Sequence, residues 1–378
     1  MMTTCSPLRK LSLPLAALLF STLAHGGTWP TWRGDAGMTG MAQETLTFPL
    51  SLAWKHEAAK PVKATAVSDG ERFYIGDAKG KFHALGAADG KPVWTYDAKD
   101  SIEGSALLAG GQVIFGTLEG TVYCLEAATG KETWKFRTEG EVRAAPNVFE
   151  RKDQPPLILI GSYDANLYAI NLKDGQKVWN VETGNYVNGS AAVVEGMTAF
   201  GGCDGFVYFI NALDGKEAGK VEIKNPVANT VAAHAGTAVL AHYGCEVVAL
   251  NAKEFKPKWV YNEREFEYFA SPAIMPDGTV FAGDRGKRLH CLAAADGTEK
   301  WAFRAKGRVD SSPVVTGGNV VFGSDDGNVY AVNIKDGSEV WKYEIAQAVQ
   351  SSPCIAGGRL VIASDDGFVY CFKQGEKK

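Results

Sequence analysis

The segment AINLKDGQKVW (Ala169–Trp179) recurs later in the chain as AVNIKDGSEVW (Ala331–Trp341). Both segments place a glycine six residues after a small residue and a tryptophan four residues after that glycine. Three more copies end at Trp94, Trp134 and Trp301, weaker copies end at Trp259 and Gly219, and Trp54 extends the series. Successive marks lie 40, 40, 45, 40, 40, 42 and 40 residues apart. That period is typical of propeller blades and of certain helical arrays.

The residues within each repeat favour the propeller. Short runs such as NVYAV and EVWKYEI alternate apolar and polar side chains, and Asp-Asp-Gly, Lys-Asp-Gly or Gly-Gly turns separate them. Such turns supply the positive φ angles that tight hairpins need. Four strands of about five residues plus their turns consume roughly 40 residues, which matches one blade. The sequence therefore predicts an all-β fold, an eight-bladed β-propeller of four-stranded antiparallel blades.

The two ends of the repeat region predict how the ring closes. The last repeat, SSPCIAGGRLVIASDDGFVYCFK (Ser351–Lys373), supplies three strands but lacks a tryptophan-bearing fourth strand. LSLAWKHE (Leu50–Glu57) has the character of that missing strand, so we expect the N-terminal strand to join the C-terminal strands and complete the eighth blade. The five additional residues of the longest repeat fall at Glu150–Pro156, where a surface loop is expected.

The segment before the repeats reads as an export signal. Arg9 and Lys10 precede an apolar run at Leu11–Leu23 that is too short to cross a bilayer as a helix. We expect residues 1–26 to be a cleavable signal peptide, with an uncleaved anchor as the alternative, residues 27–49 a lead-in, residues 50–373 the propeller and residues 374–378 a charged tail. No cysteine ends the apolar run to accept a lipid, so the mature protein is expected in the periplasm or outside the cell.

Charge and cysteine spacing exclude several functions. The formal net charge of −4 gives no basis for binding nucleic acid. No CxxC or HExxH spacing occurs, so no metal site is expected. Cys124, Cys291 and Cys371 occupy a small apolar position of the repeat, whereas Cys203 and Cys245 lie in turns of adjacent repeats and form the one pair worth testing for a disulfide. His83 and His290 replace a tyrosine of the repeat, which favours a packing role.

The glycine–tryptophan pattern resembles the tryptophan-docking motif of the pyrroloquinoline-quinone (PQQ) repeat superfamily. The resemblance covers Leu50–Lys373 and implies that seven tryptophans pack between blades: Trp54, Trp94, Trp134, Trp179, Trp259, Trp301 and Trp341. TWPTWRGDAGMTG (Thr28–Gly40) also resembles the lead-in of exported PQQ-repeat proteins, and Trp29 and Trp32 are expected to cover a face or edge of the ring.

This superfamily contains both quinoprotein dehydrogenases and non-catalytic propellers such as the barrel-assembly factor BamB, and the fold alone does not choose between them. A dehydrogenase would use PQQ with Ca²⁺ and would resemble longer chains that carry an adjacent cysteine pair, which is absent here. We expect a monomeric binding or scaffolding module without a cofactor, with protein or peptide partners and BamB-like action in outer-membrane protein assembly as one instance. Peripheral association with the outer membrane stays open.

One repeat position is the candidate site. In segments such as VDSSPVV and VQSSPCI, a variable residue follows the first apolar residue and precedes the innermost strand. We call this position the collar, because eight copies should surround one mouth of the central channel. Its members are Lys63, Glu103, Arg143, Asn188, Ala228, Phe269, Asp310 and Gln350. Convergent polar groups beside an aromatic wall predict a ligand or peptide site. The alternative is a ring that only neutralises its own charges.

Overall fold

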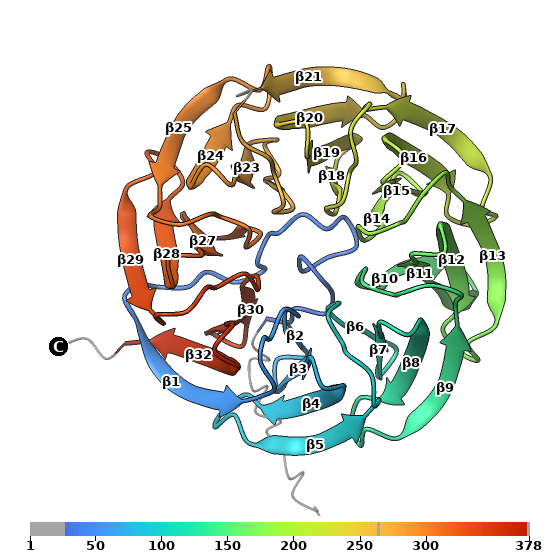
Figure 1. Cartoon of the computed structure of the whole chain (residues 1–378), viewed down its shortest axis with the longest axis horizontal. Helices are drawn as coiled ribbons and strands as arrows, with labels where there is room; N and C mark the ends of the chain where they lie inside the picture. Colours follow the sequence, from blue (N-terminus) through green and yellow to red (C-terminus); the bar gives the residue numbers. More distant parts are fainter. Residues whose placement is uncertain (1–26, 263–264, 376–378) are drawn as a thin grey trace, which may run out of the picture.

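Eight four-stranded antiparallel sheets surround a central channel in the computed structural model, which describes residues 27–262 and 265–375 (Figure 1). Each sheet is one blade. In seven blades the first strand lies nearest the axis and the last strand lies on the rim, whereas in the eighth blade β1 lies on the rim. The all-β, eight-bladed propeller predicted from the sequence is therefore confirmed. The predicted signal peptide lies outside the described residues. Within the described residues, no helix is long and apolar enough to span a membrane.

The strands fall into four concentric sets. The innermost are β2 (Val67–Ser68), β6 (Leu107–Ala109), β10 (Asn147–Arg151), β14 (Ala192–Val194), β18 (Ala232–His234), β22 (Ala273–Ile274), β26 (Val314–Thr316) and β30 (Cys354–Ala356). The second set is β3 (Arg72–Gly76), β7 (Gln112–Gly116), β11 (Gln154–Gly161), β15 (Met197–Gly201), β19 (Thr237–His242), β23 (Val280–Gly283), β27 (Asn319–Gly323) and β31 (Arg359–Ala363). The third is β4 (Lys81–Gly86), β8 (Thr121–Glu126), β12 (Asn166–Asn171), β16 (Phe206–Asn211), β20 (Glu246–Asn251), β24 (Arg288–Leu292), β28 (Asn328–Asn333) and β32 (Phe368–Gln374). The outermost is β5 (Pro92–Asp97), β9 (Glu132–Arg137), β13 (Lys177–Glu182), β17 (Glu217–Glu222), β21 (Lys256–Asn262), β25 (Glu299–Arg304), β29 (Glu339–Glu344) and β1 (Leu50–Glu57).

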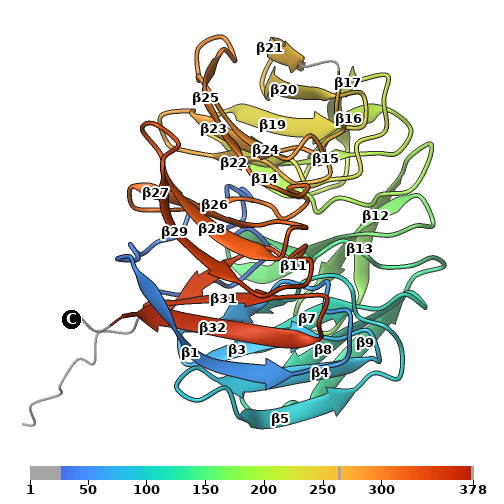
Figure 2. The same ribbon diagram turned by 60° about the vertical axis from the view of Figure 1, so that its left-hand side comes forward.

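The eighth blade closes the ring with strands from both ends of the chain. Its strand order is β1-β32-β31-β30, and the pairing of β1 with β32 runs from Leu50 opposite Gln374 to Glu57 opposite Phe368. Figure 2 shows β1 lying along β32 on the outside of this blade. The closure predicted from LSLAWKHE is confirmed, and it pairs two edges that would otherwise be open.

Tryptophans of the outermost strands join seven of the eight blades to the next blade. The indole N–H of Trp134 donates to the carbonyl of Leu172 at 2.8 Å, and the ring covers Gly175 in the turn of the following blade. All seven predicted docking tryptophans donate to a carbonyl of the neighbouring blade. A side chain on Gly175 would place its Cβ 2.7 Å from the Trp134 ring. The glycine of the repeat is therefore required by this close approach as well as by its positive φ.

The insertion at Glu150–Pro156 does not form the expected surface loop. Instead, the additional residues lengthen the hairpin of β10 and β11, whose pairing extends to Arg151 opposite Gln154. A lengthened hairpin keeps the backbone groups of the insertion hydrogen-bonded, which an irregular loop would leave to solvent.

Cys203 and Cys245 are not joined by a disulfide, and Cys124, Cys291 and Cys371 are buried as predicted.

The lead-in, residues 27–49, enters the channel and contacts every blade. Figure 1 shows it crossing the centre of the ring. Its backbone forms hydrogen bonds with the backbone of seven blades. The third blade is connected to the lead-in by hydrogen bonds of the Thr31 and Asn147 side chains. Trp29 is buried and pairs with Ser68, as expected of a cover, whereas Trp32 reaches the channel interior. The lead-in thus closes the channel as a plug.

Histidines at the repeat's tyrosine position are packed as predicted. His83 Nε2 lies 3.1 Å from Asp77, and His290 Nε2 lies 3.1 Å from Asp284. In other blades, a tyrosine such as Tyr330 donates to an aspartate of the same turn. At this repeat position, histidine and tyrosine therefore play the same structural role, which is to contact the aspartate of the adjacent turn. Both histidines are buried.

His242 should make stability fall in mild acid. Its Nδ1 accepts the Gly244 N–H at 3.0 Å, so the neutral ring carries its proton on Nε2, 3.1 Å from Glu246. Burial lowers the pKa of His242, and the Glu246 carboxylate opposes this only in part. The unfolded chain therefore binds more protons than the folded protein just below the ordinary pKa of about 6.5, and stability is lost as the pH falls through it.

We expect the melting temperature (Tm) to fall between about pH 7.5 and about pH 5.5, and His242→Asn to reduce this fall. The asparagine amide oxygen can still accept the Gly244 N–H but does not titrate. His56, whose pKa is also lowered by burial, remains in both proteins and accounts for a residual slope. An unchanged slope of Tm against pH in the variant would show that His242 does not control it.

Candidate functional site

All eight collar residues line one cavity of about 490 Å³ at the mouth of the channel. Each belongs to the segment that leads into an innermost strand, so the repeat itself brings them to the same height around the axis. Gly104 and Gly189, each next to a collar residue, lie so near the following blade that a Cβ would approach a carbonyl oxygen to 2.8 and 2.2 Å, respectively. Such close contact between inner segments is what narrows the channel to a pocket.

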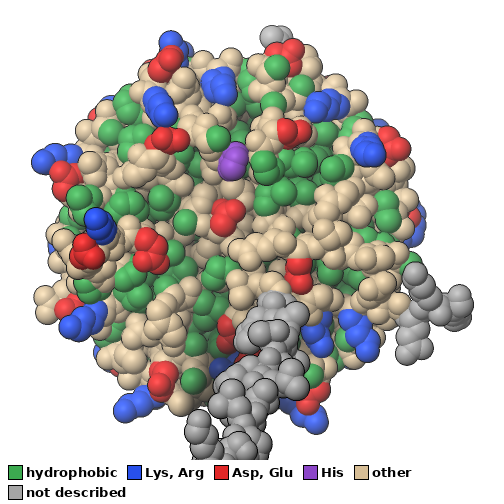
Figure 3. Space-filling view, turned by 180° about the vertical axis from the view of Figure 1, so that it is seen from behind, with side chains coloured by type: hydrophobic (Ala, Val, Ile, Leu, Met, Phe, Trp, Pro, Cys, Tyr) green, Lys and Arg blue, Asp and Glu red, His purple; other side chains and the backbone are tan. Residues whose placement is uncertain are grey.

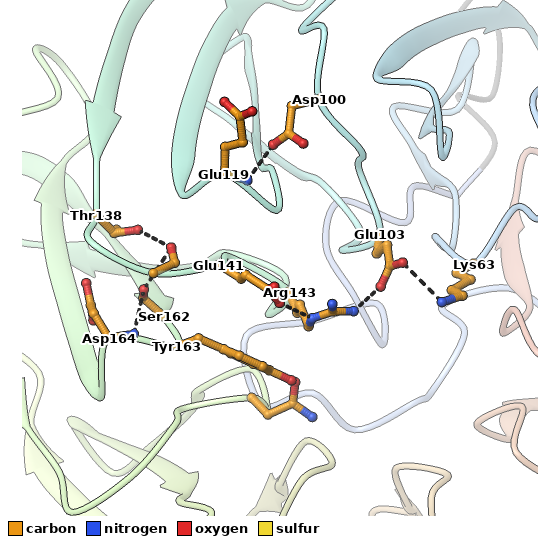
Figure 4. A network of polar contacts seen from close by, with 12 residues as sticks. Lys63, Asp100, Glu103, Glu119, Thr138, Glu141, Arg143, Ser162, Tyr163 and Asp164 are labelled. Carbon is orange, nitrogen blue, oxygen red and sulfur yellow. Dashed lines mark hydrogen bonds and ion pairs between the residues drawn. The ribbon is translucent and has the colours of Figure 1, made fainter.

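Charged collar residues on one side of the mouth are linked into a chain. Lys63 Nζ donates to Glu103 at 3.0 Å, Arg143 donates to the other oxygen of Glu103, and Arg143 Nε donates to Glu141 at 2.6 Å. Figure 4 shows these four side chains in one line, with Tyr163 beside Arg143. Each cation of this arc thus contacts a carboxylate, a pairing that the alternative of a self-neutralising ring also predicts.

The opposite arc contains a residue that the sequence reasoning missed. Arg285 donates from Nε and Nη2 to the two oxygens of Asp310, at 3.2 and 2.9 Å. Its guanidinium also lies 3.3 Å from the centroid of the Phe269 ring, and Tyr243 stacks on Phe269 at 4.5 Å. The predicted aromatic wall is thus contacted by two protein groups, Arg285 and Tyr243, and still lines the cavity.

Turn residues between the second and third strands form an additional circle at the mouth. Tyr163, Tyr243 and Arg285 occupy the same position of these turns in three blades, and Asp325 and Asp365 occupy it in two others. Tyr163 donates to Asn188 at 2.7 Å and stacks on Tyr186 at 4.6 Å. The repeat alignment that identified the collar contains this signal too, because the turn position also recurs once per blade.

Two of these turn carboxylates are held in an environment that favours their neutral forms. Burial raises the pKa of Asp325, with Asp310 adding to the effect and the hydrogen bond from Gln350 opposing it. Burial likewise raises the pKa of Asp365, with Asp325 contributing. Cations nearby oppose these shifts in part, since Arg308 and Arg285 act on Asp325 and Lys63 acts on Asp365.

The plug forms the floor of the cavity. Trp32 lines it and donates its indole N–H to Thr230 Oγ1 at 3.0 Å. Directly behind, Arg33 is fully buried and donates from Nη2 to the carbonyls of Pro272 and Pro313 at 3.2 and 2.6 Å. Burial lowers the pKa of Arg33 to about 9, although Asp35 nearby raises it. The channel is therefore a pocket open at one end only.

The contacts of the collar carboxylates bear on the alternative of Ca²⁺ with PQQ. Among the described residues, no group of three or more His, Cys, Asp or Glu side chains is placed to hold a metal ion. Ca²⁺ takes six to eight oxygen ligands. Glu103 and Asp310, the collar carboxylates, already contact Lys63, Arg143 or Arg285. Arg285 and Tyr243 already contact the Phe269 ring, which leaves less of its surface to a flat cofactor.

The fold and the plugged channel define a class, the eight-bladed propellers built from tryptophan-docked repeats. A family model described as "Outer membrane protein assembly factor BamB" matches residues 51–118, 100–254 and 259–377. These segments cover most of the chain, which therefore belongs to this family of PQQ-like repeat propellers. A comparison with curated protein sequences gave no match.

Solved structures of three kinds share the fold. BamB from Moraxella catarrhalis is 16% identical, with a TM-score of 0.72 over 86% of this chain and 100% of that one. The quinohemoprotein alcohol dehydrogenase of Comamonas testosteroni is 15% identical, with a TM-score of 0.79 over 93% of this chain and 82% of that one. The computationally designed Ika8 protein is 14% identical, with a TM-score of 0.74 over 85% of this chain and 99% of that one. At such identities the likeness establishes the fold alone.

Proposed function

We propose that this chain is an exported, non-catalytic binding module whose ligand or partner enters the channel mouth. The observation that carries the proposal is the convergence of all eight collar residues on one cavity with a closed floor. A concave site with a few fixed polar groups is where binding is expected on a rigid scaffold. Ion pairs around the mouth hold Arg143, Arg285 and Glu103 in place and so preorganise it.

Several features favour binding over redox catalysis. The collar carboxylates are occupied by Lys63, Arg143 and Arg285, so they are poor ligands for a metal ion. The predicted signal peptide supports action in the periplasm, and membership of the BamB-described family supports protein partners, with outer-membrane protein assembly as the best-known setting. The face opposite to that of Figure 1 shows acidic and basic side chains interspersed around its rim, without a large field of one sign (Figure 3). Such a surface gives no support to nucleic-acid binding.

Replacing Arg143 and Asp310 together with alanine should weaken partner binding at least about tenfold while lowering Tm by only a few degrees. The mutated pairs are partly exposed, and such ion pairs each contribute about 0–1 kcal/mol to stability. The measurement is quantitative co-purification with the tagged full chain from its native host, alongside thermal melts of both proteins.

The matched control is Asp214→Ala with Lys216→Ala, which removes one carboxylate and one cation from an exposed turn on the rim. This control should bind as the unmodified chain does. Normal binding by the collar variant would move the interaction surface to the outer rim. Dye-linked oxidation of alcohols or sugars after addition of PQQ and Ca²⁺, above a control without protein, would instead favour a dehydrogenase.

A further inference from the structure

A ring of hydroxyl groups lies two residues beyond the collar, at the floor of the cavity. Each hydroxyl oxygen accepts a backbone N–H from the neighbouring blade, with N–O distances of 2.8–3.0 Å. We call these six residues the hydroxyl ring: Thr65, Ser105, Thr230, Ser271, Ser312 and Ser352. All six line the cavity and all are buried. The third blade has Ala145 at this position, which interrupts the ring there.

The hydroxyl ring can offer hydrogen-bond donors to the cavity. A hydroxyl group has one proton and two acceptor lone pairs. In each of the six residues, a backbone N–H occupies a lone pair, and Thr230 also accepts the Trp32 indole. Within the described parts of the chain, none of these hydroxyls donates to a protein acceptor. Their protons are therefore available to a ligand that presents acceptor atoms.

A buried positive charge lies just behind this floor. Arg33 contacts the carbonyls of Pro272 and Pro313, which directly follow Ser271 and Ser312. Its Nε and Nη1 have no hydrogen-bond partner among the described residues. Asp35 already acts on this cation. A further anion nearby is also favoured, because the low dielectric of the interior strengthens the attraction.

We propose that the hydroxyl ring binds a carboxylate group at the tip of the ligand that enters the channel mouth. This inference rests on the proposed binding function and specifies the chemistry of the ligand. A carboxylate accepts several hydrogen bonds and carries the charge that the Arg33 side of the floor favours. A neutral amide in the same place would present one acceptor oxygen, and its N–H groups would face donors.

The carboxylate can come from the C-terminus of a polypeptide or from a small free acid. A cavity of about 490 Å³ has the size of a small-molecule site, so it would hold a small acid or the end of a chain. Capture of a terminal carboxylate by converging donors is a known mode of peptide recognition. Both sources share the chemistry that the hydroxyl ring would recognise.

The test uses isothermal titration of the full mature chain with three probes. These are N-acetyl-trialanine with a free carboxylate, the same peptide as its amide, and propionate. The free acid should bind at least about tenfold more tightly than the amide. Ser312→Ala with Ser352→Ala should reduce the affinity for the acid about tenfold and leave the weak binding of the amide unchanged.

The chain offers a closely matched control in the adjacent serines. Ser311 and Ser351 also accept backbone N–H groups, from Gly323 and Ala363, but they do not line the cavity. The variant with Ser311→Ala and Ser351→Ala should lose a similar amount of stability yet bind the acid within about twofold of the unmodified chain. An equal loss of affinity in this control would overturn the proposal, because the effect would then follow stability.

The three probes distinguish a polypeptide C-terminus from a small free acid. They also distinguish failure of the carboxylate proposal from failure of the proposed binding function. Tight binding of the peptide acid alone assigns a polypeptide C-terminus, and equal binding of propionate assigns a small acid. No preference for the acids over the amide up to about 10 mM overturns the carboxylate proposal. If partner binding still depends on Arg143 and Asp310 in that case, the binding function stands and only the assigned ligand chemistry fails.

Discussion

Deletion of residues 359–378 should abolish the cooperative unfolding of the whole propeller instead of removing one blade. The truncation removes β31 and β32, and β1 pairs with no strand other than β32. It also removes Phe372, whose ring packs against Trp341 at 5.5 Å. Because Trp341 donates to the carbonyl of Leu50 in β1, the seventh blade loses its docking partner as well. An opened ring exposes apolar faces of two blades at once.

Calorimetry and near-ultraviolet circular dichroism on the truncated protein would measure this loss directly. Deletion of residues 375–378 is the control, since it keeps every strand and should melt as the full chain does. A truncated protein that retains one sharp transition within a few degrees of the full chain would show that closure does not govern stability. The plug adds a second closure, because residues 27–49 connect to every blade from within the channel.

What the sequence could predict follows from its periodicity. The docking tryptophans, the closing strand and the collar are all repeat positions, so aligning the copies places them in space without knowledge of long-range contacts. This alignment predicts the places of both Trp54 and Arg143. The turn residues Tyr163 and Arg285 obey the same period, and the serines of the hydroxyl ring do so too. They were missed because no chemical expectation was attached to their positions.

The plug could not be predicted because it has no repeat. Gly37 accepts from Ala233, and Arg33 donates to Pro313, contacts between residues about 200 or more positions apart. Nothing in residues 27–49 specifies which strands they reach, since the partners are backbone groups that every blade presents alike. The two tryptophans of the lead-in indicate that it covers part of the ring. Its position inside the channel depends on long-range packing, in which Trp29 is buried.

In the two weakest repeats, the aromatic residue and the glycine have exchanged places between neighbouring blades. At six junctions, a tryptophan ring covers a glycine of the next blade, as Trp179 covers Gly215. At the junction between the fourth and fifth blades, Gly219 stands in the tryptophan position and Phe255 in the glycine position. A Cβ on Gly219 would lie 2.5 Å from the Phe255 ring. The aromatic ring therefore fills the same space from the opposite blade, where it also contacts Phe209 at 5.2 Å.

This exchange predicts strong coupling between Gly219→Trp and Phe255→Gly. The first change alone should destabilise the protein by about 1–3 kcal/mol or more, because the indole and the Phe255 ring claim one space. The second alone removes a large aromatic side chain, which costs about 3–5 kcal/mol where burial is complete. Relief of the positive φ of Phe255 offsets part of this cost. The double variant restores the arrangement of the other junctions and should recover most of the lost stability.

A double-mutant cycle on denaturant unfolding measures this coupling as the departure from additivity. The reverse exchange at an ordinary junction, Trp179→Gly with Gly215→Phe, is the matched comparison and should show coupling of the same sign. If the losses from Gly219→Trp and Phe255→Gly simply add, the two residues do not compensate each other, and the repeat there is merely degraded. A large favourable coupling at both junctions would show that each interface requires one aromatic ring and one glycine, whichever blade supplies the ring.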